Sequence, residues 1–225
     1  MNAVVLEERT IGGLHDFVLR KVLPRHAPST GRAVDLGAGS GAFAVRLMDL
    51  GLTVLAVDID PLGFKADVPF MKADLNDPGF PSILGPETFD LVVALEVIEH
   101  LENPTAFLRS VSSCLRSDGV AIITTPNVEN LPGRVKFLVS GKLRMFTEQG
   151  DRTHLTPVIL DLLLKRLLPR SGLSMVARYP YPPRGFRASR RAVALMSAGL
   201  ATMLTDRKLL GDNHVLVLSR RPSVP

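Results

Sequence analysis

The feature that most constrains this chain is an apolar run at residues 33–36 that stops at a glycine-rich turn. An acid, Asp35, lies inside the run, and three glycines follow at alternate positions, Gly37, Gly39 and Gly41. Because glycine has no Cβ atom, such a turn lets a ligand lie against the backbone, and the free N–H groups of the next helix face that ligand. The pattern therefore predicts a strand, a ligand-binding turn and a helix in immediate succession.

Strands and helices are predicted to alternate along the rest of the chain. The predicted strands lie at residues 32–36, 53–57, 70–73, 89–95, 120–124, 173–179 and 214–218. The predicted helices lie within 4–23, where Pro24 closes the first one, at 41–50, 104–116, 131–140 and 188–204, and after Thr156, which caps one more. Residues 76–88 are expected to be mostly loop, and Asp118–Gly119 a turn. This order indicates an α/β fold with a doubly wound sheet.

The composition fits one domain without disulfide bonds. The chain has 225 residues, of which 46% are hydrophobic, enough for a large core. It has one cysteine, and its first residues do not show a basic segment followed by an apolar one. We therefore expect a single domain in a reducing cytoplasm.

Charge is distributed unevenly along the chain. Residues 1–150 carry 14 Lys and Arg against 18 Asp and Glu, whereas residues 151–225 carry 13 against 4, so the two parts have net charges of −4 and +9. A basic end suits an anionic substrate, a membrane surface or nucleic acid, or is simply a solvated face. Aromatic residues are scarce there, which argues against nucleic acid.

Part of this basic region combines arginines with an apolar stretch. Residues 192–205 carry no charge, and several arginines come directly before them. Fourteen residues are too few to cross a bilayer, but a helix of this kind can rest on an anionic membrane. The sequence leaves two interpretations open for residues 184–205: peripheral membrane contact, or a helix packed against the last strands.

The glycine turn is compatible with two cofactors. Residues 37–42 satisfy the G-x-G-x-x-G/A pattern of dinucleotide-binding loops, so an NAD-dependent oxidoreductase is one alternative. Asp35 argues against it, because a carboxylate at the edge of the loop repels a pyrophosphate but attracts an ammonium or a sulfonium. Acids also follow the next two predicted strands, at Asp58 and Asp74.

Together these acids and glycines resemble the class I S-adenosylmethionine-dependent methyltransferases. The resemblance implies a Rossmann-like sheet of seven strands, with the last one, at 214–218, antiparallel. It also implies that Asp58 binds the ribose hydroxyls, that Asp74 binds the adenine amino group, and that the glycine loop supports the methionine part. The implied cofactor-binding residues are Asp35, Gly37, Ala38, Gly39, Gly41, Asp58, Ile59, Asp74, Leu75 and Leu95.

The run E-V-I-E-H-L at residues 96–101 narrows the resemblance to methyltransferases of the ubiquinone-biosynthesis O-methyltransferase type. In some relatives an E-x-x-E-H motif binds a metal, and here Glu96, Glu99 and His100 have the i, i+3, i+4 spacing that places side chains on one helical face. They are candidate ligands of Mg²⁺ or Mn²⁺, with His154 as a fourth. The alternative is a hydrogen-bonded wall of the active site without a metal.

Methyl transfer to a hydroxyl needs an acceptor held in line with the methyl group and a base that removes the proton. His100 and His154 are the candidate bases, and Asp151 is a candidate orienting group for His154. The predicted activity is O-methylation of a small molecule, a quinol or a glycan; the remaining alternative is a non-catalytic binding or partner-activating subunit. No feature indicates the oligomeric state.

The resemblance also implies how the single domain is divided. Residues 1–30 are expected to form a helical lid, 31–127 the cofactor-binding core, 128–155 a lid on the acceptor side, and 156–225 the C-terminal helices and last strands.

Overall fold

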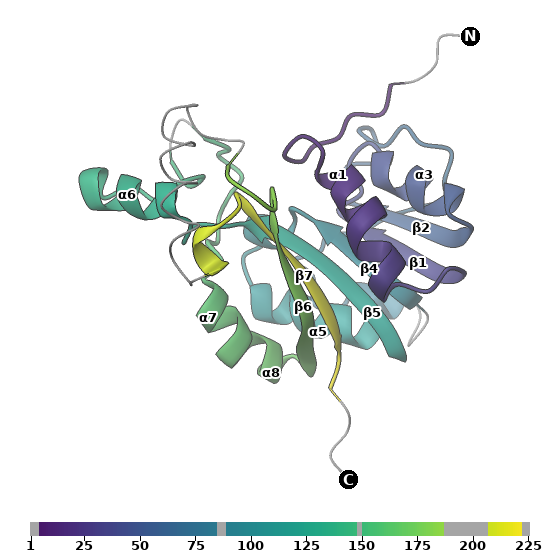
Figure 1. Cartoon of the computed structure of the whole chain (residues 1–225). Coiled ribbons are helices and arrows are strands. Elements are labelled where there is room, and N and C mark those ends of the chain that lie inside the picture. Colours follow the sequence, from purple (N-terminus) through teal and green to yellow (C-terminus); the bar gives the residue numbers. More distant parts are fainter. Residues whose placement is uncertain (1–4, 85–88, 148–149, 187–206, 222–225) are drawn as a thin grey trace.

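Seven strands form one sheet in the computed structural model, which describes residues 5–84, 89–147, 150–186 and 207–221 (Figure 1). Their order across the sheet is β3-β2-β1-β4-β5-β7-β6. All neighbours are parallel except β7, which is antiparallel to both β5 and β6. The strands are β1 (Gly31–Leu36), β2 (Leu52–Asp58), β3 (Phe70–Lys72), β4 (Phe89–Leu95), β5 (Leu115–Pro126), β6 (Leu173–Tyr181) and β7 (Asn213–Arg220). The predicted sheet, including its antiparallel last strand, is confirmed.

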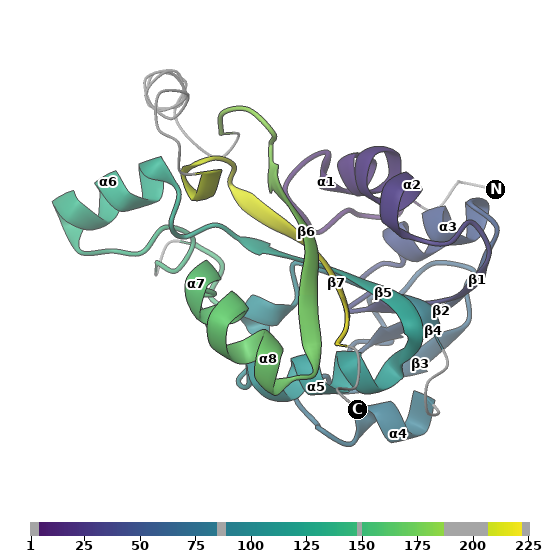
Figure 2. The same cartoon turned by 60° about the horizontal axis from the view of Figure 1, so that its bottom comes forward.

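Helices cover both faces of this sheet (Figures 1 and 2). One face carries α1 (Leu14–Phe17), η1 (Val18–Val22), α2 (Leu23–His26) and α3 (Ala42–Asp49). The other carries α4 (Phe80–Leu84), α5 (Pro104–Cys114), α7 (Leu160–Leu162), η3 (Leu163–Leu167) and α8 (Leu168–Arg170). Alternate residues of the buried strands serve the two faces: Leu91 and Val93 of β4 pack with the first group, Val92 and Ala94 with the second.

Four local predictions were wrong, for physical reasons. The N-terminal helix runs past Pro24 to His26, because Pro24 lies in the first turn of α2, where a missing N–H costs little. Residues 80–84 within the expected loop form α4. Asp118–Gly119 lies within β5 rather than in a turn. Thr156 does not cap a helix, because its N–H and Oγ1 donate to the carbonyls of Glu99 and Leu101, and the helix begins later, at Leu160.

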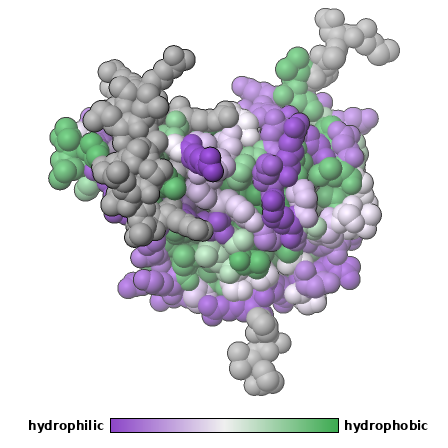
Figure 3. All heavy atoms as spheres, in the orientation of Figure 1, coloured by the Kyte–Doolittle hydropathy of each residue, from purple (hydrophilic) through white to green (hydrophobic). Residues whose placement is uncertain are grey.

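The helix α6 (Leu131–Ser140) follows β5 as predicted and projects from one end of the sheet (Figure 1). Its outer side is apolar, which Figure 3 shows as a green tip, and the exposed side chains there are Val135, Phe137, Leu138 and Val139. The predicted helix 188–204, and residues 187–205 of the basic apolar stretch, lie outside the described residues. Among the helices that are described, none is long and apolar enough to cross a membrane.

Candidate active site

A cavity of about 480 Å³ opens at the carboxyl ends of β1, β2 and β4. In parallel sheets this is the edge where ligands bind, because the strand order reverses between β1 and β4. Nine of the ten predicted cofactor residues line it: Asp35, Gly37, Ala38, Gly39, Asp58, Ile59, Asp74, Leu75 and Leu95. The N-terminal segment closes a further side of the cavity with Glu7, Arg9, Thr10 and His15.

The three glycines of the turn share a backbone conformation, but Gly39 and Gly41 have different roles. All have positive φ, a conformation that other residues adopt at a cost. A Cβ on Gly41 would lie 2.3 Å from the Cβ of Ala66, so this glycine, which lies behind the cavity wall, is needed for packing. A Cβ on Gly39 would meet only Arg9, at 3.7 Å, so Gly39 leaves open space on the cavity side. Gly39 is therefore the point where a ligand can approach the backbone.

Backbone N–H groups hold the acids that follow β2 and β3. The two carboxylate oxygens of Asp58 accept from the N–H groups of Gly39 and Asp60, at 2.8 and 2.9 Å. Asp74 accepts from the N–H of Asn76 at 2.9 Å. Each carboxylate oxygen can accept a further hydrogen bond, so both acids present fixed acceptors to the cavity they line.

Asp35 is the buried acid of the cavity. It is 2% exposed, and its Oδ2 has no hydrogen-bond partner among the described residues. Burial, reinforced by the negative charge of Asp58, raises the pKa of Asp35 to about 7. An uncompensated carboxylate at this place fits a ligand that brings a positive charge.

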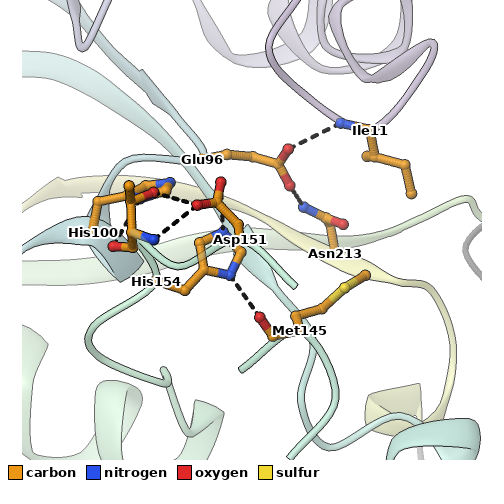
Figure 4. Close-up of polar contacts among 8 residues, drawn as sticks. Ile11, Glu96, His100, Met145, Asp151, His154 and Asn213 are labelled. Carbon is orange, nitrogen blue, oxygen red and sulfur yellow. Dashed lines mark hydrogen bonds and ion pairs between the residues drawn. The ribbon is translucent and has the colours of Figure 1, made fainter. Parts of the chain in front are cut away.

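Glu96 stands directly after β4 in a strained conformation, with φ of +55°. Its carboxylate accepts from the Ile11 N–H at 2.9 Å and from the side-chain amide of Asn213 (Figure 4). Its own N–H donates to Oγ1 of Thr124 at 2.8 Å. Burial raises the pKa of Glu96. Glu96 thus joins the N-terminal segment to the start of β7, and it does not belong to the cluster of possible metal ligands described below, where the sequence had placed it.

His100 lies in η2 (Ile98–His100), and its orientation is fixed through Thr153. The Thr153 hydroxyl donates to Oδ1 of Asp151 at 2.5 Å, so the His100 Nδ1–H donates to Oγ1 and the carbonyl of Thr153, at 2.8 and 3.1 Å. In the neutral ring this leaves Nε2 as the unprotonated nitrogen. Burial, together with the nearby His154, lowers the pKa of His100, so the ring is neutral at neutral pH. Asp151 therefore orients His100 rather than His154, the partner expected from the sequence; it lies 3.9 Å from Nε2 of His154.

His154 is held in the same manner by a different group. Its Nδ1–H donates to the Met145 carbonyl at 3.0 Å, and its ring meets that of His100 edge to face, with centroids 4.7 Å apart (Figure 4). As in His100, Nδ1 makes the hydrogen bond to the protein and Nε2 does not take part in it.

Glu99 completes a cluster with the two histidines. Candidate ligand atoms of Glu99, His100 and His154 all lie within 4.8 Å of one another. Glu99 is fully buried, neither carboxylate oxygen has a well-formed hydrogen bond among the described residues, and burial raises its pKa well above the usual range. Two imidazole nitrogens and one carboxylate in this arrangement can ligate a divalent cation or take part in proton transfer.

Several residues of this site were missed at the sequence level. They are Ile11, Arg144, Met145, Thr153, Asp212 and Asn213. Thr153 was within reach, because it lies between Asp151 and His154, which the sequence had singled out; the others belong to no motif, and only the fold brings them to the site.

Three comparisons bear on this geometry. A family model described as "Methyltransferase domain" matches residues 7–177. The chain is 30% identical over 146 residues to the ubiquinone biosynthesis O-methyltransferase of Rhodopseudomonas palustris (strain TIE-1), a match that covers 60% of this chain and 57% of the relative. It is 30% identical over 118 residues to the mitochondrial ubiquinone biosynthesis O-methyltransferase of Schizosaccharomyces pombe, over 49% and 43% of the two chains.

A solved structure shares the whole fold. A SAM dependent methyltransferase from Archaeoglobus fulgidus superposes with a TM-score of 0.60 at 19% identity, covering 92% of this chain and 94% of the other. At that identity the likeness concerns the fold alone. The curated relatives resemble this chain over only about half of their length.

Proposed function

The chain belongs to the methyltransferase domain family, which uses S-adenosylmethionine, and we propose that it methylates a hydroxyl oxygen of a small molecule, quinol or glycan. The observation that carries this proposal is the arrangement of His100, which lines the cavity, and His154, whose ring meets that of His100; in each ring Nδ1 donates to a backbone carbonyl, so that Nε2 is the nitrogen that can accept a proton. Such nitrogens can take the proton of a hydroxyl nucleophile. The named relatives, which are O-methyltransferases, support the same reaction.

The residues on the sheet side would hold the cofactor. Asp58 presents a fixed carboxylate to the two ribose hydroxyls, and Asp74 and Leu75 lie where the adenine would bind. Asp35 faces the positively charged methionine end. Gly39 leaves room for the ligand to touch the backbone. Asp35 also makes the NAD-dependent alternative unfavourable, because its carboxylate would face the pyrophosphate of NAD.

Two chain segments would cover the bound ligands. The N-terminal segment, part of the proposed lid at residues 1–30, reaches the cavity through the Ile11 N–H on Glu96 and through Ser40, whose hydroxyl donates to the Glu7 carbonyl at 2.8 Å. The proposed acceptor-side lid at 128–155 supplies Met145 and Thr153, which orient the histidines. The apolar side of α6 belongs to this second segment and suits an apolar acceptor. Peripheral membrane contact through 184–205 would serve the same kind of acceptor.

A divalent cation fits the acceptor side. The buried Glu99 carboxylate lacks a well-formed hydrogen bond, and a cation bound there with His100 and His154 as further ligands would compensate it. The two rings would then act as ligands instead of bases. Two imidazoles favour Mn²⁺ over Mg²⁺, which prefers oxygen ligands. When bound, such a cation supplies Lewis-acid activation of the acceptor oxygen. The protein's own part is to hold both rings by their Nδ1 atoms and to keep Glu99 away from water.

The test has two parts. Calorimetry with S-adenosylhomocysteine, with and without Mn²⁺ or Mg²⁺, measures cofactor and metal binding; we expect 1:1 binding of S-adenosylhomocysteine and tighter binding of Mn²⁺ than of Mg²⁺. Transfer of radiolabelled methyl groups to a panel of catechols and glycans then measures turnover. Cofactor binding without transfer to any hydroxyl acceptor would favour a non-catalytic, partner-activating subunit.

A further inference from the structure

The two non-glycine residues with positive φ among the described residues are Glu96, at +55°, and Met145, at +70°. Glu96 lines the cavity and Met145 contacts His154, although 49 positions separate the two residues in the sequence. Non-glycine residues persist in this conformation only where their surroundings hold them there. The groups that hold these two residues converge on one short segment, Asp212–Asn213, at the start of β7.

Asn213 acts on Glu96 directly, through the hydrogen bond from its side-chain amide to the carboxylate. Asp212 acts on the segment that contains Met145. Its carboxylate lies 2.7 Å from Nη1 of Arg144, the residue before Met145. The backbone around Asp212 is fixed as well, because its N–H donates to the Tyr181 carbonyl at 2.7 Å and its carbonyl accepts from the Asn127 N–H at 2.6 Å.

The ion pair between Arg144 and Asp212 is buried. The side chain of Arg144 is 9% exposed and that of Asp212 is not exposed at all. Breaking a buried pair by neutralising one partner is strongly unfavourable, because the other charge is left in a medium of low dielectric constant. The pair therefore ties Arg144, and with it the start of the turn that contains Met145, to the start of β7 by charge attraction.

Met145 transmits this constraint to His154. Its carbonyl accepts the Nδ1–H of His154 at 3.0 Å, and this bond selects the tautomer of the ring (Figure 4). In a neutral ring with Nδ1 protonated, Nε2 is the acceptor nitrogen, and the ring lies beside that of His100. If the Met145 carbonyl turned away, water or Asp151, 3.9 Å from Nε2, would compete for the proton on the ring.

We infer that Arg144 and Asp212 are positioning residues: their buried ion pair holds the Met145 carbonyl against Nδ1 of His154 and so keeps Nε2 of His154 free for the acceptor side of the site. The relevance of this inference to catalysis rests on the proposed function, in which His154 serves as base or metal ligand. The control of the tautomer itself does not depend on that function. Partners that fix the tautomer of a functional histidine typically change activity or metal affinity by about 10- to 100-fold when they are removed.

The experiment measures the tautomer in the full-length chain. Two-bond ¹H–¹⁵N correlation spectra of protein with ¹⁵N-labelled histidine, recorded at pH 8, distinguish the nitrogen that carries the proton in each of the five histidines. A His154→Ala spectrum assigns the signal of His154. We expect the Nδ1–H form of His154 in the wild type and a mixture with the Nε2–H form in Asp212→Asn and Arg144→Met. Arg144→Lys keeps the charge and should retain most of the Nδ1–H form.

The control is Asp90→Asn, which removes an acid from a more exposed ion pair. Asp90 also pairs with an arginine, Arg116, at 3.4 Å, but it stands near the amino end of β4, at the edge of the sheet away from the cavity. This variant should leave the tautomer of His154 and the rate of methyl transfer unchanged. In Asp212→Asn and Arg144→Met we expect a 10- to 100-fold lower kcat with an unchanged KM for S-adenosylmethionine.

Three results would overturn the inference. The first is an Nε2–H tautomer of His154 in the wild type, a result that does not depend on whether any variant folds. The second is an unchanged tautomer in a folded Asp212→Asn or Arg144→Met protein, whatever happens to its activity. The third is an equal change in Asp90→Asn. A shifted tautomer with normal turnover in His154→Ala would instead preserve the inference and reject the proposed role of His154.

Discussion

The cofactor side and the acceptor side of the cavity are built in different ways. On the cofactor side the acids that follow β2 and β3 are held by nearby backbone: Asp58 by the N–H groups of Asp60 and Gly39, and Asp74 by the N–H of Asn76. On the acceptor side the partners of Glu96 are far apart in the sequence, at 85 positions for Ile11 and 117 for Asn213, and Thr153 lies 53 positions from His100. The cofactor side can form once its strands and turns have formed, whereas the acceptor side requires the whole fold.

This difference predicts that the two halves can be disabled separately. The largest effect is expected on the acceptor side. His100→Ala and His154→Ala should lower methyl transfer by about 100- to 10,000-fold, the range typical for loss of a general base. The affinity for S-adenosylhomocysteine should stay within about threefold, because a change on the acceptor side leaves the bonds to the ribose and adenine intact. Radiolabelled methyl transfer measures the first quantity; unchanged turnover in both variants would remove the two histidines from the mechanism.

On the cofactor side, Asp58→Ala should weaken the binding of S-adenosylhomocysteine by about 100-fold, because two charge-assisted hydrogen bonds to the ribose are lost, worth about 3 kcal/mol in total. The substitution also removes the acceptor of the Gly39 N–H. Calorimetry measures the affinity, and Asp60→Asn serves as a control, since Asp60 reaches Asp58 only through its backbone N–H. Equal affinities in wild type and Asp58→Ala would contradict the assigned ribose site.

The glycine turn offers a comparison within the cofactor side. Gly41→Ala should lower the free energy of unfolding by about 2–4 kcal/mol, because its φ is +88° and the new Cβ would overlap Ala66. Gly39→Ala should lower it by about 1 kcal/mol, since only the positive φ opposes that change. Its main effect should be on cofactor affinity instead. Urea unfolding and calorimetry on the two variants measure both quantities; a larger loss of stability in Gly39→Ala would reverse the assignment.

The smallest effect concerns pH. Burial raises the pKa of Asp35 to about 7, so the acid is charged above that pH and neutral below it. The attraction for the ammonium of the cofactor should therefore weaken as the pH falls through 7, by at most about tenfold per pH unit. The free protein should respond in the opposite sense, because a raised pKa in the folded state means that stability falls as the pH rises toward 7. Calorimetry between pH 5.5 and 8.5 measures the affinity, and Asp35→Asn should remove this dependence.

The difference between the cofactor side and the acceptor side also explains which features could be predicted from the sequence. The sequence correctly placed the strand before Gly37, the strand at 89–95, and the positions of Asp58 and Asp74 after their strands. Each of these features is encoded by residues that are neighbours in the sequence. Glu96 was grouped with Glu99 and His100 on spacing alone. The segment after β4 does not continue as a regular helix from Glu96, whose positive φ turns its carboxylate toward Ile11 and Asn213.

The support of the histidines was out of reach for the same reason. Nothing in the sequence connects Asp212 with Arg144, since this pair meets only when β7 lies antiparallel beside β5. Met145 lies nine positions before His154, but no sequence pattern marks its carbonyl as the partner of that ring. The antiparallel direction is what brings the beginning of β7, rather than its end, to the ligand edge of the sheet. A motif records residues that are close in sequence, and the contacts of Asp212 with Arg144 and of Asn213 with Glu96 are not of that kind.

One titration tests the division most directly: S-adenosylhomocysteine added, in a calorimeter, to the wild type, to Asp58→Ala and to His100→Ala. The account predicts 1:1 binding with closely similar affinity in the wild type and in His100→Ala, and binding about 100-fold weaker in Asp58→Ala. No binding to the wild type, or a loss in His100→Ala as large as that in Asp58→Ala, would contradict a cofactor site that stands independently of the acceptor side.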